Sequence, residues 1–496
     1  MKTSLPSACV LLAAASLLLS GLPEAGAATT YTYNGAQTTS GNTWSSTANW
    51  SPTGAPGSGD TAVLGNVTSN TTITYDSAAS GTVGTITFQQ ATAGTTLTLD
   101  VSRSASTISN ALTVSASAGT SQLLLEGGVT LKDSGGITIG PGGLFTYNAS
   151  AAAGTVNGAL TVQSGGTFAI SGTSKALTVT GNFTLNGAAS GTGSENGLSL
   201  QGTTNVISAS NTTAFNAVSL TGNGSGGTST LTSNSRLTGT LSLRSTGNAT
   251  LNFGSSYSGN YQVSNIALLQ QTLGATTTFQ LGSDIFTQAL AAATFSQGGQ
   301  GGTGAVGLAV DLNGHTLDFS TYASTYQFAP TDGQNGGNVA TAWTISSSTG
   351  SGTIRAASFD LSQVAQVGGL GGVAVGANVI LNATGTASAN NLGYAAGNAA
   401  AGWSIDPTST FLYSGAATSA APATLVSNQA IGNLKVTAGF LNVNQAALSL
   451  GGGVTLAGGG LLLNGTGGAG VLTLAAGQAF AMSGGTLMFD LGTAQD

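Results

Sequence analysis

Short alternating segments separated by glycine-rich turns fill residues 157–187, and this repeat constrains the fold more than any other feature. Each segment carries apolar side chains two residues apart, in the pairs Leu160/Val162, Phe168/Ile170, Leu177/Val179 and Phe183/Leu185. Because side chains alternate faces along a strand, each segment has one apolar and one small polar face. A strand this short cannot bury its face alone, so such units must stack into one continuous core.

The same rhythm extends well beyond this stretch. Alternating segments recur from about residue 72 to residue 260, with turns about 8–12 residues apart, which is the spacing of all-β folds. One rung of a β-helix uses about two or three such strands. The pattern therefore predicts an all-β parallel β-helix, a solenoid, of roughly 22 residues per rung and on the order of 20 rungs. At about 4.8 Å per rung the column would be roughly 100 Å long.

The composition is unusually poor in charge. Among 496 residues there are 8 Lys+Arg, 15 Asp+Glu and 1 His, and the formal net charge is −7. The basic residues after residue 27 are scattered, so no phosphate-binding patch is visible and a nucleic-acid partner is not expected. Thr, Ser and Asn must cover the surface, as they do on secreted all-β repeat proteins.

The first 27 residues have the features of a secretory signal peptide. Lys2 precedes an apolar core at residues 10–19, and Ala25-Gly26-Ala27 is an A-x-A cleavage site, which predicts a mature start at Ala28. The core is too short to span a bilayer comfortably, and no later run predicts a membrane helix. The one cysteine, Cys9, lies in this segment, so the mature chain would contain no disulfide. We expect export to the cell exterior or outer surface.

The remaining chain divides into segments that differ in how regularly the alternating strand pattern recurs. We predict an N-terminal segment that leads into and caps the column (28–75), regular β-helix repeats (76–260), irregular rungs with insertions (261–427) and C-terminal β-strand repeats (428–496). Three stretches could be short helical or irregular excursions, at residues 265–273, 285–295 and 359–367. A ligand site is expected among these irregular loops, because loops carry function more often than scaffolds do. The chain stops within the rhythm at Asp496, so we expect that further sequence follows in the complete protein.

Two tryptophans stand near the predicted start of the column. Trp44 and Trp50 could form a glycan-stacking site, or they could be a cap that covers the open end of the stack. Repeat columns need such caps at their ends, and this interpretation is the one we favour. A second aromatic group could likewise stack on sugars or anchor an insertion, and again we favour packing. Its members are Phe319, Tyr322, Tyr326, Phe328 and Trp343.

No set of residues predicts catalysis. His315 lies in a predicted strand–turn–strand with Asn313-Gly314 as the turn, and it has no second His or Cys with which to build a zinc site or a triad. The carboxylates that glycoside hydrolysis would require, such as Asp311, Asp318 and Asp360, are dispersed among turns. Calcium repeats and a phosphate-binding loop are absent. We therefore expect no catalytic residue, no metal and no cofactor.

Three passages resemble one protein family. They are Trp44-x4-Asn49-Trp50-Ser followed by Pro56-Gly-x-Gly-Asp60, then the stretch 311–317 (DLNGHTL), and then 484–492 (GGTLMFDLG). Together with the strand rhythm they are similar to bacterial autotransporter-associated β-strand-repeat proteins, which are large secreted surface proteins. The resemblance implies a right-handed parallel β-helix on or outside the cell surface, and it carries no catalytic residues to transfer.

These observations predict a non-enzymatic secreted or surface protein, a stiff rod that displays loops and acts as a structural or adhesin-like element. Its partners would be surface polysaccharide or other cells. The alternative is a β-helical carbohydrate-active enzyme, a lyase or glycoside hydrolase, or a glycan-binding module. The ligand-binding candidates within either function are Trp44, Trp50, Tyr322, Tyr326 and Trp343.

Overall fold

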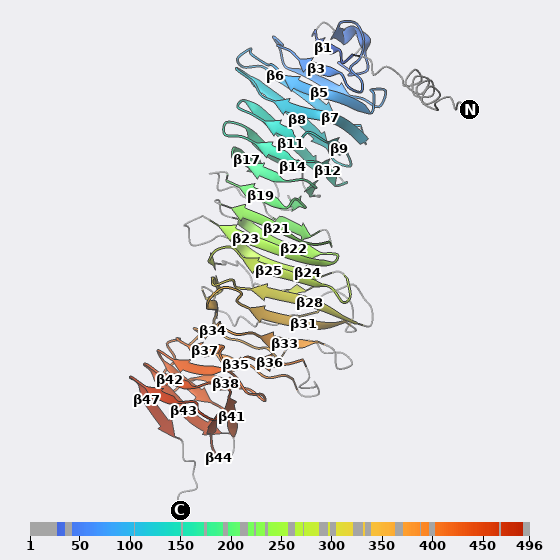
Figure 1. Cartoon of the computed structure of the whole chain (residues 1–496). Helices are drawn as coiled ribbons and strands as arrows, with labels where there is room; N and C mark the ends of the chain where they lie inside the picture. The colour runs from blue at the N-terminus through green and yellow to red at the C-terminus, as the bar shows by residue number, and fades with distance from the viewer. Residues whose placement is uncertain are drawn as a thin grey trace, which may run out of the picture.

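The computed structural model confirms the predicted parallel β-helix (Figure 1). It describes residues 27–34, 42–103, 105–149, 152–172, 176–191, 197–208, 217–222, 225–233, 237–255, 263–270, 272–286, 296–297, 304–320, 331–332, 339–362, 371–386, 388–395, 402–465 and 468–489. Over these residues the chain forms strands that coil into an elongated column, with its N-terminal rungs at one end and its C-terminal rungs at the other. Within that part of the chain the only helical turn is the 3-10 turn η1 (Thr47–Asn49).

Parallel ladders of strands build the column from β1 (Thr30–Tyr33) to β36 (Ser404–Ile405). The first ladder contains β1 (Thr30–Tyr33), β3 (Thr61–Leu64), β5 (Thr82–Phe88) and β7 (Ala105–Val114), with β2 (Trp50–Ser51) antiparallel to β1. From β7 it continues as β9 (Thr130–Asp133), β12 (Gly154–Asn157), β15 (Leu177–Val179), β18 (Gly197–Leu200), β20 (Ala217–Gly222), β22 (Leu237–Ser245) and β24 (Val263–Gln270). A second branch from β7 contains β10 (Ile137–Ile139), β13 (Leu160–Val162), β16 (Phe183–Leu185), β19 (Thr204–Ile207), β21 (Ser225–Ser233), β23 (Asn248–Ser255), β25 (Thr276–Leu281), β28 (Gly304–Asp311), β31 (Val339–Ser346), β33 (Gly372–Val375) and β36 (Ser404–Ile405). Opposite them lie β4 (Thr71–Tyr75), β6 (Thr96–Val101), β8 (Thr120–Glu126), β11 (Gly143–Ala149), β14 (Thr167–Gly172) and β17 (Ala188–Gly191).

Further ladders begin at residue 285 and continue through the C-terminal rungs. One contains β26 (Ile285–Phe286), β29 (Thr316–Asp318), β32 (Gly352–Ala356), β34 (Val379–Ala383), β37 (Thr410–Tyr413), β39 (Asn433–Val436), β42 (Val454–Leu456) and β46 (Phe480–Met482). Another contains β35 (Ala389–Asn391), β38 (Ala423–Val426), β40 (Phe440–Val443), β43 (Gly460–Gly465) and β47 (Thr486–Phe489), with β44 (Gly468–Ala469) antiparallel to β43. Two short pairs complete it, β41 (Ala447–Leu450) with β45 (Val471–Leu474) and β27 (Ser296–Gln297) with β30 (Thr331–Asp332).

Successive rungs place like residues on top of one another. In the central ladder Leu160 pairs with Ile137 of the rung before and with Phe183 of the rung after, and all three side chains are buried. The outward neighbours are threonines in the same register, Thr138, Thr161 and Thr184. The alternation read from residues 157–187 is therefore the alternation between the core and the surface of the column, and burial of the apolar faces supplies its main driving force.

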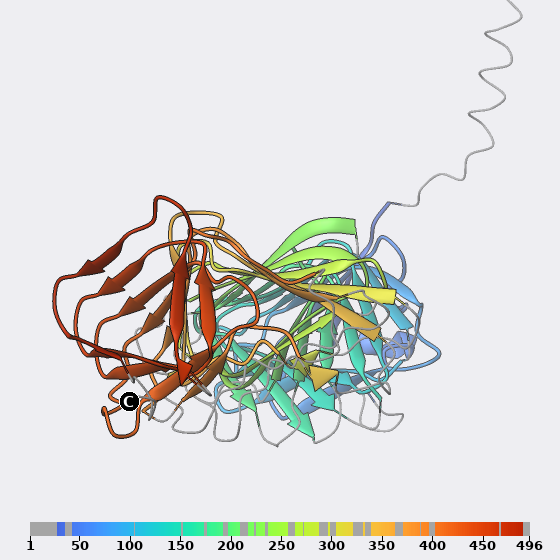
Figure 2. The same cartoon turned by 90° about the horizontal axis from the view of Figure 1, so that it is seen from below.

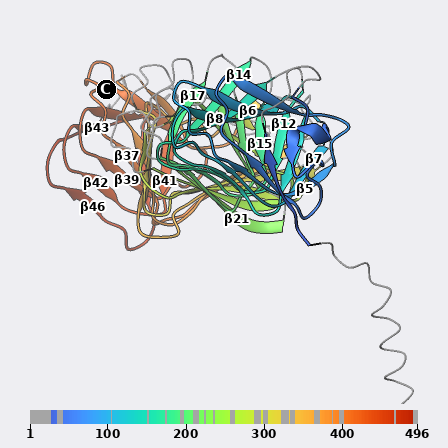
Figure 3. The same cartoon turned by 90° about the horizontal axis from the view of Figure 1, so that it is seen from above.

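Rung length varies along the column. Thr180 contacts Asn157 across one regular rung, 23 residues away, whereas Arg355 contacts Asp318 across a rung of 37 residues. The longer rungs fall in the region predicted to be irregular. Figures 2 and 3, which look along the column, show the C-terminal rungs β37–β47 displaced to one side of those that precede them.

The prediction that residues 265–273 could form a short helix is wrong. Residues 263–270 form strand β24, which pairs in parallel with β22. Ile266 and Leu268 face the core. In the sequence Leu269 follows Leu268 directly, so the run lacks the polar–apolar alternation that marks the other strands. Ladder pairing with β22 decides the conformation here. Of the other two stretches, residues 287–295 and 363–367 lie outside the described residues, while Ile285 and Phe286 form β26.

The predicted strand–turn–strand around His315 is confirmed. Leu312 and Leu317 are buried, and the turn between them places Asn313 at φ 48° and Gly314 at φ 79°. Glycine is required at the second position, because a Cβ there would meet the Thr349 carbonyl oxygen at 2.5 Å.

Buried amide side chains link neighbouring rungs by pairing with backbone N–H and carbonyl groups. Asn390 accepts a hydrogen bond from the Phe359 N–H at 3.0 Å and donates to the Thr424 carbonyl at 2.9 Å, so one side chain joins three rungs. Asn205 does the same between Phe183 and Thr230. These neutral contacts satisfy buried polar groups without ions.

Candidate functional site

The two N-terminal tryptophans close the first rung. Trp44 and Trp50 are 0% and 2% exposed, and their rings meet edge to face with centroids 4.7 Å apart. The Trp50 indole N–H donates to the Trp44 carbonyl at 2.9 Å, and the Trp44 indole N–H donates to the Pro56 carbonyl at 3.3 Å. Rings buried in this way offer no face on which a sugar could stack, which favours the cap interpretation over the glycan-stacking one.

The polar residues of the same motif complete this cap. Asn49 donates to the Thr43 carbonyl at 2.8 Å. Asp60 accepts from the Gly57 N–H at 2.9 Å and from the Thr29 N–H at 3.0 Å, which joins the start of the first strand to the turn before β3. The motif thus fixes the geometry of a chain end rather than presenting groups to a ligand.

The aromatic group predicted between residues 319 and 343 does not form an exposed platform in the described part of the chain. Trp343 lies in β31 and is 1% exposed, and Phe319 is also buried. Tyr322, Tyr326 and Phe328 lie outside the described residues.

The carboxylate of Asp311 holds a turn together. It accepts from the Gln280 side chain at 2.9 Å, from the Ser348 N–H at 2.9 Å and hydroxyl at 2.7 Å, and from the Asn313 N–H at 3.0 Å. Burial raises the pKa of Asp311, but these hydrogen bonds outweigh burial, so the pKa lies below its usual value. A carboxylate stabilised in its ionised form by four donors is suited to a structural role.

Asp318 and Arg355 form an ion pair between neighbouring strands of one ladder. The Arg355 guanidinium lies 2.8 Å from Asp318 Oδ2, and the Asp318 side chain is 5% exposed. Asp318 Oδ1 accepts from the Ser320 N–H at 2.7 Å, and Asp360 accepts from the Ser362 N–H at 3.0 Å in the same pattern. Each of these acids therefore pairs with the backbone N–H two residues later, as in an Asx turn.

Metal-ligand geometry is also missing from the part of the chain that the structure describes. Within it no three His, Cys, Asp or Glu side chains come together. His315 Nδ1 lies 3.6 Å from Asp284 Oδ1, and both side chains are substantially exposed.

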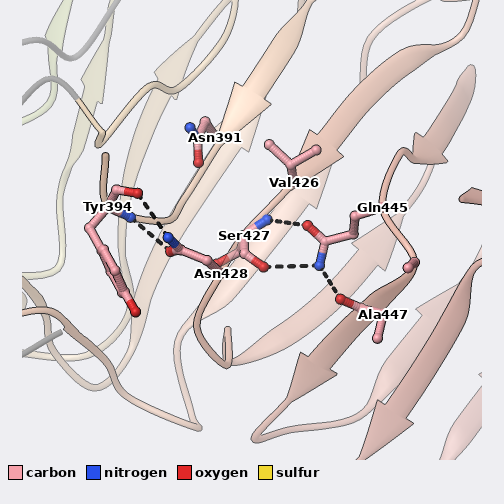
Figure 4. Close-up of a pocket in the computed structure, with 8 residues that line it drawn as sticks. Asn391, Tyr394, Val426, Ser427, Asn428, Gln445 and Ala447 are labelled. Atoms are coloured by element: carbon pink, nitrogen blue, oxygen red, sulfur yellow. Dashed lines mark hydrogen bonds between the residues drawn. The ribbon is translucent and has the colours of Figure 1, made fainter. Parts of the chain in front are cut away.

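A pocket of about 400 Å³ lies at one corner of the C-terminal column (Figure 4). It is lined by Asn391, Tyr394, Val426, Ser427, Asn428, Gln445, Ala446 and Ala447. Three consecutive rungs contribute, because Asn391 ends β35, Val426 ends β38 beside it in register, and Gln445 follows β40. The lining contains amide, hydroxyl, phenol and small apolar groups and no charged residue.

Two carboxamides fix the walls of this pocket. Asn428 donates to the Tyr394 carbonyl and accepts from the Tyr394 N–H, both at 2.9 Å. Gln445 pairs with Ser427 in the same way, accepting from its N–H at 2.6 Å and donating to its carbonyl at 2.9 Å (Figure 4). Each side chain makes the two backbone hydrogen bonds that a neighbouring strand would make. It thereby holds a turn in place where the backbone departs from the ladder.

Other polar groups of the pocket remain available. Asn391 accepts from the Gly393 N–H at 2.9 Å, but among the described residues its Nδ2 group donates to no partner. The half-buried Tyr394 ring packs against the core and lies 6.1 Å from the Trp403 ring, and its hydroxyl likewise has no partner within the described chain. The lining therefore includes two donors without a partner in the described chain, one on Asn391 and one on the aromatic ring of Tyr394.

Sequence reasoning placed a ligand site among the irregular loops of residues 261–427, and this pocket lies partly within that range. It did not identify the residues. Asn391, Asn428 and Gln445 stand in glycine-rich turns where Asn and Gln are ordinary, and only rung stacking brings them together. The one local signal was Tyr394, an aromatic residue within a turn.

In the described part of the chain, no helix has the length and apolar character that a membrane crossing requires. Comparison with known proteins gives no match to any protein family, to any curated protein or to any solved structure.

Proposed function

We propose that this chain is a non-enzymatic, exported β-helical protein that works at the cell surface as a stiff, charge-poor rod with an adhesin-like role. The observation that carries the proposal is that acidic side chains of this chain hold turns of its own fold. Asp311, Asp318 and Asp360, the carboxylates that glycoside hydrolysis would require, each cap a turn of the column itself.

The N-terminal sequence supports export, and the composition supports a surface role. A positively charged start, a short apolar core and an A-x-A site precede residue 28. With 8 Lys+Arg in 496 residues, the surface is covered mainly by hydroxyl, amide and backbone groups. Such a rod offers a long neutral surface for contact with polysaccharide or with other cells.

Attachment of whole cells tests this function. Cells that lack the gene are compared with wild-type cells for attachment to a polysaccharide-coated surface and to one another. We expect attachment to fall without the protein and to be restored by the full-length chain carrying D311N and D318N, because Asn retains an acceptor oxygen for each turn. Unchanged attachment on deletion would contradict the proposal.

The rival function, a carbohydrate-active enzyme, makes a different prediction. The purified full-length protein would release new reducing ends or unsaturated uronic acids from a polysaccharide, and the D311N and D318N substitutions would abolish that release. If the wild-type protein releases these products and the variants do not, the enzyme function replaces the adhesin proposal.

A further inference from the structure

We propose that the pocket at Asn391, Tyr394, Asn428 and Gln445 binds a neutral sugar unit of a polysaccharide. This inference rests on the proposed surface function and names the ligand class for one site on the rod. Four properties of the pocket carry it: the charge of the lining, its free donors, its aromatic ring and its rigidity.

The lining selects against charged ligands. None of its eight residues is charged, so phosphate, sulfate and carboxylate groups find no cation to replace their lost hydration. A neutral ligand rich in hydroxyl groups loses less hydration free energy when it enters the pocket. The volume of about 400 Å³ falls in the range of small-ligand sites, which is roughly 300–1,000 Å³.

The available groups match the two kinds of surface that a sugar ring presents. Sugar hydroxyls donate and accept, and they can accept from Asn391 Nδ2 and pair with the Tyr394 hydroxyl, which have no partner within the described chain. The apolar C–H face of the ring can pack against the Tyr394 ring, which stays half-buried beside Trp403.

The site is held in place before any ligand arrives. The Tyr394 backbone is fixed by both hydrogen bonds to Asn428, and the next turn is fixed by Gln445. Little conformational entropy is therefore lost on binding. The pocket is nevertheless open and offers few contacts, so a single sugar unit would bind with a dissociation constant on the order of 0.1–10 mM.

Asn391 allows a matched test of the free donor. At the equivalent point of other turns Asp311, Asp318, Asp360 and Asp406 cap the residue two positions on, as Asn391 caps Gly393. The substitution N391D therefore keeps the turn cap while it removes the Nδ2 donor and adds a negative charge. Its effect on binding is separable from an effect on folding.

Affinity electrophoresis of the full-length protein tests the proposal, with hydroxyethyl cellulose, dextran, starch or β-glucan as neutral probes in the gel and alginate as an anionic probe. We expect at least one neutral polymer to retard the wild-type protein, with the apparent affinity reduced at least fivefold by N391D and at least tenfold by Y394A. The exposed N444A variant, beside the pocket but not in its lining, should bind within twofold of wild type. Far-UV circular dichroism of each variant checks that the column is intact.

Three results would overturn the inference. They are no retardation by any neutral polymer, retardation that Y394A and N391D leave unchanged, or retardation only by anionic polymers. Each would leave the cell-attachment result standing on its own, because loss of attachment on gene deletion does not depend on this pocket. If deletion of the gene leaves cell attachment unchanged while neutral polymers retard the wild-type protein but not Y394A, the proposed function is wrong and the binding site remains.

Discussion

Asn428 pairs with Tyr394 as one strand pairs with the next, although the two residues lie 34 positions apart and only one contributes its backbone. The Asn428 carboxamide donates to the Tyr394 carbonyl and accepts from the Tyr394 N–H, both at 2.9 Å. Gln90 makes the same two contacts with Val67, at 3.0 Å and 2.9 Å. Side-chain amides thus extend the ladders through turns where the backbones separate, and a chain with few charges keeps its backbone groups paired.

The substitution N428A tests this pairing. It leaves the Tyr394 N–H and carbonyl without their partner, and we expect a loss of about 1–2 kcal/mol in local stability. Hydrogen exchange at residues 392–395 should accelerate, while exchange in β13 and β16 stays unchanged, because each rung contacts only its neighbours. The N444A variant is the matched control. Equal exchange in N428A and wild type would show that the amide pairing does not hold this turn.

The ion pair of Asp318 and Arg355 gives a second test. R355M leaves a nearly buried carboxylate without its guanidinium, which lies 2.8 Å away in the wild-type protein. We expect a loss of about 1–3 kcal/mol, less than for a fully buried pair because the Arg355 side chain is 40% exposed. The double variant D318N/R355M should recover most of this loss. A double-mutant cycle from denaturant unfolding that gives no coupling would contradict the account.

Asp133 should make stability depend on pH. Its carboxylate accepts from the N–H groups of Gly135 and Gly136, both at 2.8 Å, and its other oxygen is buried without a partner in the described chain. Burial raises the pKa of Asp133 to about 6, although these two hydrogen bonds act to lower it. Because the folded pKa lies above the unfolded one, this contribution to stability is complete below about pH 4 and is lost as pH rises through about 6.

The substitution D133N isolates that effect. Other acids such as Asp311 and Asp406 have lowered pKa values owing to hydrogen bonds, so the pH profile of the wild-type protein mixes opposite trends. The difference in thermal midpoint between D133N and wild type should therefore increase in favour of D133N between pH 4 and pH 7. A difference that is constant over this range would show that Asp133 has an ordinary pKa.

The cap predicts unequal effects of two substitutions at Trp44. W44F keeps an aromatic ring but removes the N–H that donates to Pro56, and we expect a cost of about 1 kcal/mol. W44A empties the space between Trp50 and Tyr75, at an expected cost of about 3–5 kcal/mol. Hydrogen exchange should then rise first in β1 and β3. Uniform loosening of the whole column in W44A, or none, would contradict a capping role.

The sequence predicted the scaffold well because the scaffold depends on a local signal. Leu160 and Val162 point inward and Thr161 points outward, as a two-residue alternation requires. The signal was weaker where pairing within a ladder decides the conformation, as in β24, in whose sequence Leu269 breaks the alternation. It was weakest at the pocket, because Asn391 and Gln445 meet only through the stacking of rungs of unequal length. The Trp44/Trp50 motif was informative about structure, and its burial favours the cap over the sugar-stacking alternative.

The location and first residue of the native protein test the central proposal most directly. Intact cells, culture medium and cell lysate are fractionated, and the protein in each fraction is identified by its N-terminal sequence and intact mass. An exported surface rod predicts that the protein lies outside the cell, in the medium or exposed on intact cells, and begins at Ala28. Protein that is confined to the lysate and still carries residues 1–27 would contradict the proposal.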